Sequence, residues 1–471
     1  MSFTSVEFLI FLVLFALLYK VCPRGFQAFC LLLASYLFYC TTSWRAAAAL
    51  AASTLVAFGA ALLIERFRDR PAARSIALGS TLLLTAYLIF FKALPLLQQK
   101  GLASVVMPLG LSYYSFKLIS YVLDVYWDRL KPTRDVVTFA AFVAFFPQIV
   151  AGPIERAGPF LSQVGSRPAA LSDALPRLAW GLVKKLVIAD HLAPAINAVF
   201  GDVAGCHGAP VWLAFYLWPL QLYADFSGLT DIAIGAGRLF GITGPENFNR
   251  PFTASSISDY WRRWHMSLTT WLGDYVFTPL RMATRNAGKW GLSFSITINM
   301  IAIGLWHGLT WGYFVFGLLH SVYLIIDSLS MRARKSWFKR HACLDKAGEW
   351  LGWLLTFHLV AIALVFFRAR FVSDAVLFLS HLWTWPAGFT SDLSKLEPVL
   401  RALAIGVAGY LVLELGERFR PDEKWRALIP TAPRVLRWSF YATAALVFSF
   451  GLLLLVASGG GAKNPFLYAV F

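Results

Sequence analysis

Residues 290–326, WGLSFSITINMIAIGLWHGLTWGYFVFGLLHSVYLII, decide the fold because they run for 37 residues without a charged side chain. A single helix of this length would reach about 55 Å, well beyond the ~30 Å of hydrocarbon in a bilayer. Residues 308–312, GLTWG, lie near the middle and supply a break, and basic clusters flank both ends. The stretch therefore predicts a helical hairpin that returns to the cytoplasmic side of a membrane.

The rest of the chain has the composition of a membrane protein. Of its 471 residues, 58% are hydrophobic and 14% are charged, whereas roughly a quarter are charged in a soluble domain. Runs without a charge recur at residues 25–44, 46–64, 75–91, 136–154, 203–224, 350–367 and 438–462, and residues 3–19 are interrupted only by Glu7. We expect an all-α polytopic membrane protein with about 10–12 membrane helices plus re-entrant or interfacial helices, in one domain over residues 1–471.

The net charge of +17 does not predict a nucleic-acid partner, because the basic residues form short clusters between the apolar runs, as topology signals do. Placing the clusters at residues 66–74, 281–289, 332–340 and 418–437 in the cytoplasm puts both termini outside. The first apolar stretch has no basic leader before it, so we expect a retained span rather than a signal peptide. The five cysteines show no metal-ligand spacing, and no metal site is expected.

Residues 147–320 differ from the generic apolar runs before them, because they carry Gly, Pro, Trp, Asp, Asn and His at membrane depth. Such groups are tolerated there only where protein or a water-filled cavity covers them, which predicts a central funnel or tunnel. Residues 255–282 contain five charged side chains, each costing ~2.5–3.5 kcal/mol at the bilayer centre, so they cannot form an ordinary span. The spacing of Trp261, Trp264 and Trp271 predicts an aromatic stripe on one face of an interfacial helix.

Two histidines are the candidate reacting groups. His307 lies inside the charge-free run, where an ionisable ring is costly unless it lines a cavity or has a partner. His265 lies 42 residues earlier in the segment WRRWHMSL, and both rings could converge on one centre where a neutral imidazole takes a proton from a hydroxyl and returns it to a leaving group. The alternatives are a carbonyl-bonded buried ring for His307, a headgroup-bonded interfacial ring for His265, and a packing histidine for His320.

Two carboxylates, Asp225 and Asp231, lie in the segment YADFSGLTD within an otherwise apolar region. Asp225 could line the cavity or orient a histidine, and its alternative is a helix cap or an interhelical hydrogen bond. We expect Asp231 to cap a helix. Residues 247–251, NFNRP, are expected to form a turn that leads into the interfacial helix.

Five segments in order resemble the membrane-bound O-acyltransferase (MBOAT) family, in its bacterial alginate O-acetylation branch. They are FPQIVAGP at 146–153, YADFSG at 223–228, ENFNRPF at 246–252, WRRWHMSL at 261–268 and GLWHG at 304–308. The resemblance extends from the start of the chain to about Asp327. It implies an all-helical fold around a tunnel or funnel, a catalytic histidine at His307, and a second site position, asparagine or histidine across the family, at His265. The motif members Tyr223, Asp225, Asn249, Trp261 and Trp306 are expected to line the cavity, with His320 in a supporting position.

The resemblance also implies a function. We expect a bacterial inner-membrane O-acyltransferase that moves an acyl group, acetyl above others, from a cytoplasmic thioester such as acetyl-CoA towards hydroxyls of an exported polysaccharide, with no bound cofactor. His307 would be the general base or carry a transient acyl group, and His265 would polarise or position the donor carbonyl. A periplasmic acyltransferase is the implied partner. Two alternatives stay open, D-alanylation of teichoic acid and a non-catalytic transporter whose polar middle third is a permeation path.

Overall fold

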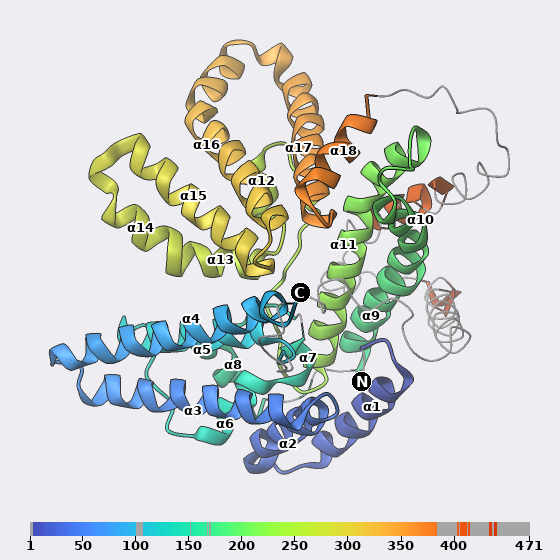
Figure 1. The fold of residues 1–471 in the computed structure, drawn as a ribbon. Coiled ribbons are helices and arrows are strands. Elements are labelled where there is room, and N and C mark those ends of the chain that lie inside the picture. Colours follow the sequence, from blue (N-terminus) through green and yellow to red (C-terminus); the bar gives the residue numbers. More distant parts are fainter. Residues whose placement is uncertain are drawn as a thin grey trace. The chain divides into compact units, whose positions relative to one another are not determined.

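The computed structural model describes residues 3–99, 107–150, 152–166, 168, 171–383, 403–404, 406–411, 413–414, 433–435 and 438–439. Figure 1 shows that these residues form helices, and no strand occurs among them, which confirms the all-α prediction. They fall into two compact units: the first takes residues up to 182, 228–245 and 433–439, and the second takes 183–227 and 246–414. A single membrane domain over the whole chain stays a prediction.

The first unit begins with helices that match the N-terminal apolar runs. Its helices are α1 (Val6–Val21), α2 (Gln27–Cys40), α3 (Trp44–Arg66), α4 (Pro71–Gln99), α5 (Leu111–Tyr126), α6 (Val136–Ala144), α7 (Phe146–Ile149), α8 (Ala157–Gln163) and α9 (Leu171–Leu182). Hydroxyl caps start two of them, because the Ser5 side chain accepts from the Phe8 N–H and the Ser43 side chain accepts from the Ala46 N–H. Helices α3, α4 and α5 pack on one another.

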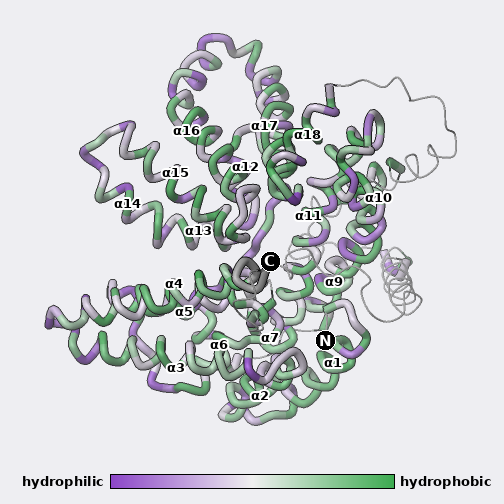
Figure 2. The backbone as a smooth tube through the Cα atoms, in the orientation of Figure 1, coloured by the Kyte–Doolittle hydropathy of each residue, from purple (hydrophilic) through white to green (hydrophobic). Residues whose placement is uncertain are grey.

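Four described helices are long and apolar enough to cross a membrane: Trp44–Arg66, Pro71–Leu94, Trp311–Arg340 and Asp345–Arg368. In Figure 2 the lengths of α3 and α4 are mostly hydrophobic and the turn between them is hydrophilic. That turn carries Arg66, Arg68 and Arg70 of the first basic cluster. The expected count of 10–12 membrane helices and the central funnel stay predictions. Nearly all of the run at 438–462, and the tail after it, lie outside the described residues.

The charge-free run at 136–154 does not form one long helix. Helix α6 ends at Ala144, and Phe145 leaves the helical region with ψ at 103° before α7 begins. Pro147 lies at the start of α7, where its missing N–H removes no hydrogen bond inside the helix. If α6 continued through Pro147, the proline would remove one backbone hydrogen bond from the helix. The run therefore breaks just before this residue.

The second unit contains the predicted hairpin. Its elements are the π-helix η2 (Val183–Ala189), α10 (Asp190–Gly201), the 3-10 turn η3 (Pro251–Thr253), α12 (Ile257–Trp261), α13 (Met266–Leu272), the π-helical turn η4 (Gly273–Phe277), α14 (Thr278–Ala283), α15 (Gly288–His307), α16 (Trp311–Arg340), α17 (Asp345–Arg368) and α18 (Val372–His381). Helix α11 (Ala209–Arg238) contributes residues 209–227 to this unit and 228–238 to the first. An apolar core joins α10, α11, α17 and α18, with Phe215 and Phe378 both at most 3% exposed.

The break between α15 and α16 falls at residues 308–310, as the glycine-containing segment predicted. The two helices pack closely and run side by side in Figure 1. Close approach depends on glycines, because a Cβ at Gly304 would lie 2.2 Å from the Tyr313 carbonyl oxygen and one at Gly317 would lie 2.6 Å from that of Met300. Small residues at such crossings let helices in membranes pack backbone to backbone.

Candidate active site

The predicted interfacial helix over residues 255–282 is not continuous, which corrects the expectation of one aromatic stripe. Helix α12 ends at Trp261 and α13 starts at Met266. Between them His265 takes a left-handed backbone, with φ at 44° and ψ at 52°. Such a conformation is uncommon for residues other than glycine and ends a helix locally. Trp261, Trp264 and Trp271 therefore lie on separate elements, and all three are buried.

The break at His265 is tied to the segment that carries the NFNRP motif. The Asn249 N–H donates to the Arg263 carbonyl at 2.9 Å, and the Met266 N–H donates to the Asn247 carbonyl at 2.9 Å. In addition, the Asn247 side-chain oxygen lies 3.0 Å from His265 Nδ1. His265 is 1% exposed, and burial lowers its pKa to about 3, so the ring is neutral at pH 7.

Both candidate histidines lie against one indole. The His265 ring centroid is 5.7 Å from that of Trp306, and the His307 centroid is 4.8 Å from it. His307 is the last residue of α15 and is 5% exposed. Its ring also contacts Phe367 on α17, at 4.8 Å between centroids. The structure therefore brings His265 and His307 together around Trp306, as their predicted convergence requires.

His320 lies on α16 in an aromatic cage and is fully buried. The Trp261 Nε1–H donates to His320 Nδ1 at 3.2 Å, and the His320 ring lies 4.7 Å from Phe316. Phe316 in turn contacts Phe367, the ring that packs on His307. This geometry fits the packing interpretation of His320, in which Trp261 holds the ring and two phenylalanines connect it to His307.

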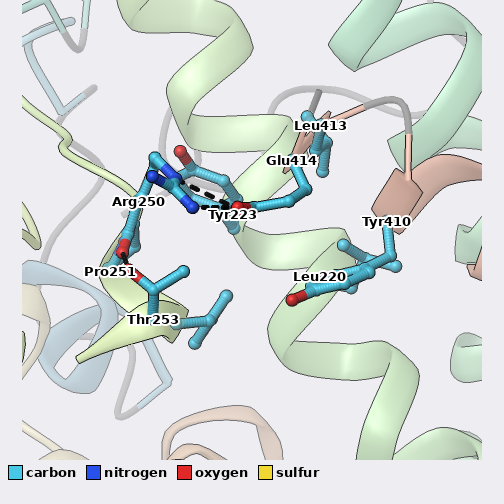
Figure 3. A pocket seen from close by; sticks show the side chains of 9 residues that line it. Leu220, Tyr223, Arg250, Pro251, Thr253, Tyr410, Leu413 and Glu414 are labelled. Carbon is cyan, nitrogen blue, oxygen red and sulfur yellow. Dashed lines mark hydrogen bonds and ion pairs between the residues drawn. The ribbon is translucent and has the colours of Figure 1, made fainter. Parts of the chain in front are cut away.

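Tyr223 lies on α11 and lines a small pocket. Figure 3 shows Tyr223 beside Arg250, which is paired with Glu414, and Thr253 and Tyr410 belong to the same lining. The Tyr223 ring also packs on Trp264, at 6.2 Å between centroids, one residue before His265. Tyr223 thus lines this pocket and contacts the segment that holds the second histidine, and its place in a reaction cavity stays a prediction.

Asp225 forms an interhelical ion pair, which was one of its expected roles. Its Oδ1 accepts from Lys185 Nζ at 2.8 Å, and the same ammonium lies 2.9 Å from Asp190. Lys185 belongs to the π-helix η2, and it is 1% exposed. The expectation that Asp231 caps a helix is wrong. Asp231 lies inside α11, and its carboxylate accepts from Arg177 Nε at 2.6 Å.

Asn249 is exposed, and its backbone N–H bonds to the Arg263 carbonyl; its place in the cavity lining stays a prediction. The motif contains two asparagines, and the sequence offered no signal to choose between them. Asn247, 0% exposed, is the one whose amide meets His265. Sequence reasoning missed this residue because the contact joins positions 18 residues apart through a left-handed turn.

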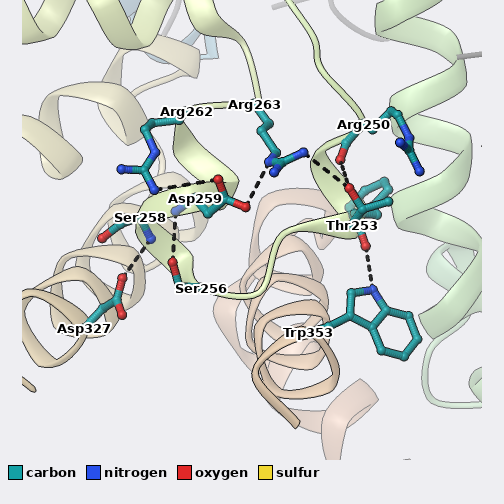
Figure 4. Close-up of polar contacts among 10 residues, drawn as sticks. Arg250, Thr253, Ser256, Ser258, Asp259, Arg262, Arg263, Asp327 and Trp353 are labelled. Atoms are coloured by element: carbon teal, nitrogen blue, oxygen red, sulfur yellow. Dashed lines mark hydrogen bonds and ion pairs between the residues drawn. The ribbon is translucent and has the colours of Figure 1, made fainter. Parts of the chain in front are cut away.

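Three charged side chains of residues 255–282, Asp259, Arg262 and Arg263, are paired with one another, as Figure 4 shows. Asp259 accepts from Arg263 Nε at 2.9 Å and lies 3.7 Å from Arg262. The Ser258 N–H donates to Asp327 on α16 at 3.0 Å. The Trp353 Nε1–H on α17 donates to the Phe252 carbonyl at 2.7 Å. The last two contacts hold residues 252–258, which lead into the WRRWH segment, against α16 and α17.

The pattern of the membrane-bound O-acyltransferase family matches residues 129–369, a range that includes His265, Trp306 and His307. The chain belongs to the membrane-bound O-acyltransferase family. As a member of the MBOAT family it is a multi-pass membrane protein and an O-acyltransferase, which sets aside the non-catalytic transporter. The family match agrees with the resemblance drawn from the five sequence segments.

Several relatives extend this likeness. A probable alginate O-acetylase AlgI of Pseudomonas putida is 32% identical over 505 residues, with 100% of both chains covered. A peptidoglycan O-acetyltransferase of Helicobacter pylori is 31% identical over 307 residues, covering 58% of this chain and 56% of that protein. A teichoic acid D-alanyltransferase of Streptococcus thermophilus is 28% identical over 347 residues, covering 68% and 80%.

Proposed function

We propose that this MBOAT protein moves an acetyl group from acetyl-CoA or another cytoplasmic acyl thioester towards hydroxyls of an exported polysaccharide of the alginate, cellulose or peptidoglycan type. The observation that carries the proposal is the position of His265 and His307 against one Trp306 ring, inside the stretch that matches the family. Support for the acetyl group and the polymer comes from relatives named for O-acetylation of alginate and of peptidoglycan.

In this proposal His307 is the general base. Its neutral imidazole takes the proton of an acceptor hydroxyl while the hydroxyl oxygen attacks the thioester carbonyl carbon. The carbon–sulfur bond then breaks, the proton passes to the departing sulfur, and the products are an ester and a free thiol. The side chains of Trp306 and Phe367 pack on the ring and limit its rotation.

The proposed setting is a bacterial inner membrane with both termini outside the cytoplasm, as the basic clusters indicate. The donor reaches the site from the cytoplasm and the acceptor from the other side. A periplasmic acyltransferase that receives the acetyl group is the proposed partner, and the polysaccharide is the final acceptor.

A second candidate is the D-alanylation of teichoic acid. The relative named as a D-alanyltransferase covers 68% of this chain, at 28% identity. The relative named AlgI covers the whole chain at 32% identity, which favours transfer of an acetyl group. The two candidates differ in the acyl group found on the surface polymer.

The test compares His307→Ala with His341→Ala, an exposed histidine between α16 and α17. Each variant is produced in a strain that lacks the native gene, its amount in the membrane is measured by immunoblot, and esters on the surface polymers are analysed chemically. We expect His307→Ala to remove the ester and His341→Ala to keep it. An ester level in His307→Ala equal to that of the wild type would overturn the role of His307, and D-alanyl rather than acetyl esters would select the second candidate.

A further inference from the structure

The amide of Asn247 has an orientation that its neighbours determine. The terminal amide atom built as Oδ1 lies 3.2 Å from the Ser267 backbone nitrogen, 2.9 Å from the Ser267 hydroxyl and 3.0 Å from His265 Nδ1. A backbone N–H can only donate a hydrogen bond, so the atom that it meets must be the amide oxygen and not the NH2 group.

The orientation of this amide decides the tautomer of His265. Because the Asn247 oxygen can only accept, the His265 Nδ1 that faces it must carry the hydrogen and donate. In a neutral imidazole the other ring nitrogen then has a lone pair and no hydrogen. His265 Nε2 is therefore an acceptor.

The surroundings hold this arrangement in place. The Met266 N–H donates to the Asn247 carbonyl, so the backbone of Asn247 is also bonded to the residue that follows His265. Phe226 packs edge-on against the His265 ring at 4.7 Å between centroids, and Trp306 packs at 5.7 Å. With both rings packed against it, the imidazole cannot turn Nδ1 away from Asn247 without moving against these neighbours.

We propose that Asn247 is a positioning residue that locks His265 in the Nδ1–H tautomer, so that Nε2 accepts a hydrogen bond from an O–H or N–H of the substrates. This inference rests on the proposed function and changes one part of it. The expectation from the sequence was that His265 polarises or positions the donor carbonyl. A ring nitrogen without a hydrogen cannot donate to that carbonyl, so in this proposal His265 does not polarise it. Its role is to orient, next to His307, a substrate group that donates a hydrogen bond to Nε2.

The variants that test the proposal are Asn247→Leu, which removes the acceptor at similar volume, and Asn247→Asp, which keeps an acceptor at the same place. Asn286→Leu changes an exposed asparagine and is the matched control. The full-length protein is purified in detergent, and kcat and KM for acetyl-CoA turnover are measured from pH 5 to pH 9. Removing the hydrogen-bond partner of a metal-bound histidine changes activity by about 10–100-fold, and we take the same range for this histidine.

We expect Asn247→Leu to lower kcat by about 10–100-fold with little change in KM, and Asn286→Leu to leave both unchanged. Asn247→Asp should keep the tautomer and most of the activity at high pH. A carboxylate beside the ring favours its protonated form, so activity of Asn247→Asp should fall at a higher pH than that of the wild type as the medium is acidified. A merely structural role would not move this acidic limb.

The tautomer itself is read from the nitrogen-15 spectrum of histidine-labelled protein, with the His265 signal identified by its loss in His265→Asn. We expect an Nδ1–H signal in the wild type and in Asn247→Asp, and a mixture in Asn247→Leu. An Nε2–H signal in the wild type, or an unchanged tautomer and kcat in Asn247→Leu, would overturn the proposal. The spectrum does not depend on turnover, so a wild-type protein with the expected tautomer but no thioester turnover would count against the proposed function alone.

Discussion

Replacing Gly304 by alanine should disturb the position of His307 without touching its ring. Gly304 lies one helical turn before His307 on α15, at the point where α15 meets the start of α16. A Cβ there would lie 2.2 Å from the Tyr313 carbonyl oxygen and 3.1 Å from its carbon. The obstacle is backbone, so rotation of a side chain cannot relieve it.

The size of the effect follows from these distances. A carbon atom approaches a carbonyl oxygen to about 3.3 Å at closest, so the two helices must separate locally by about 1 Å. Misplacement of a reacting group by 1 Å can reduce a rate by about 100-fold. That factor corresponds to about 2.7 kcal/mol in the activation free energy. Overpacking should also lower the free energy of unfolding, by about 1–3 kcal/mol.

The assay compares thioester turnover and the thermal unfolding midpoint of Gly304→Ala with those of Gly79→Ala. A Cβ at Gly79, inside α4, meets nothing within 4 Å, so this variant controls for the loss of a helical glycine. We expect Gly304→Ala to lose about 100-fold in kcat, and Gly79→Ala to keep the wild-type rate. Equal rates and equal midpoints for Gly304→Ala and the wild type would show that the close approach does not determine where His307 lies.

Three further predictions concern buried polar contacts. Arg177→Met should lower the free energy of unfolding by about 3–5 kcal/mol, because Asp231 keeps its buried charge, and the double variant with Asp231→Leu should regain much of the loss in thermal scans. Burial lowers the pKa of His265 to about 3 in the folded protein, whereas the unfolded value is about 6.5. Between these two values the unfolded state binds a proton that the folded state does not, so the free energy of unfolding should fall as pH drops from about 6.5 towards 3. Thermal scans of His265→Asn should show a weaker dependence over that window, and equal slopes would contradict the assignment. Trp261→Phe should lower the free energy of unfolding by about 1–3 kcal/mol, because it removes the hydrogen bond to His320. A thermal unfolding midpoint equal to that of the wild type would refute this prediction.

The sequence predicted those features that depend on neighbouring residues. The hairpin break at residues 308–310 follows from a local glycine-containing segment inside a run too long for one crossing. Likewise, the N-terminal runs became helices α1 to α4 because apolar length alone determines such helices in a membrane. The convergence of His265 and His307 was expected from their chemistry and family motifs, and the shared contact with Trp306 provides its geometry.

Features that depend on distant contacts were not predictable. The aromatic spacing around His265 fits a continuous helix, but hydrogen bonds to Asn247 and Asn249 end the helix there. No periodic pattern in a single sequence contains that information. The same holds for Lys185, whose charge lies between apolar runs and whose carboxylate partner, Asp225, is 40 residues away.

The left-handed backbone at position 265 has a consequence for which amino acids can stand there. Among residues other than glycine, asparagine, aspartate and histidine adopt this region most readily, whereas β-branched side chains are strained in it. The family resemblance implies asparagine or histidine at this position. Both residues that the resemblance implies are therefore ones that the left-handed region tolerates, so main-chain geometry restricts this position as well as its hydrogen-bond chemistry.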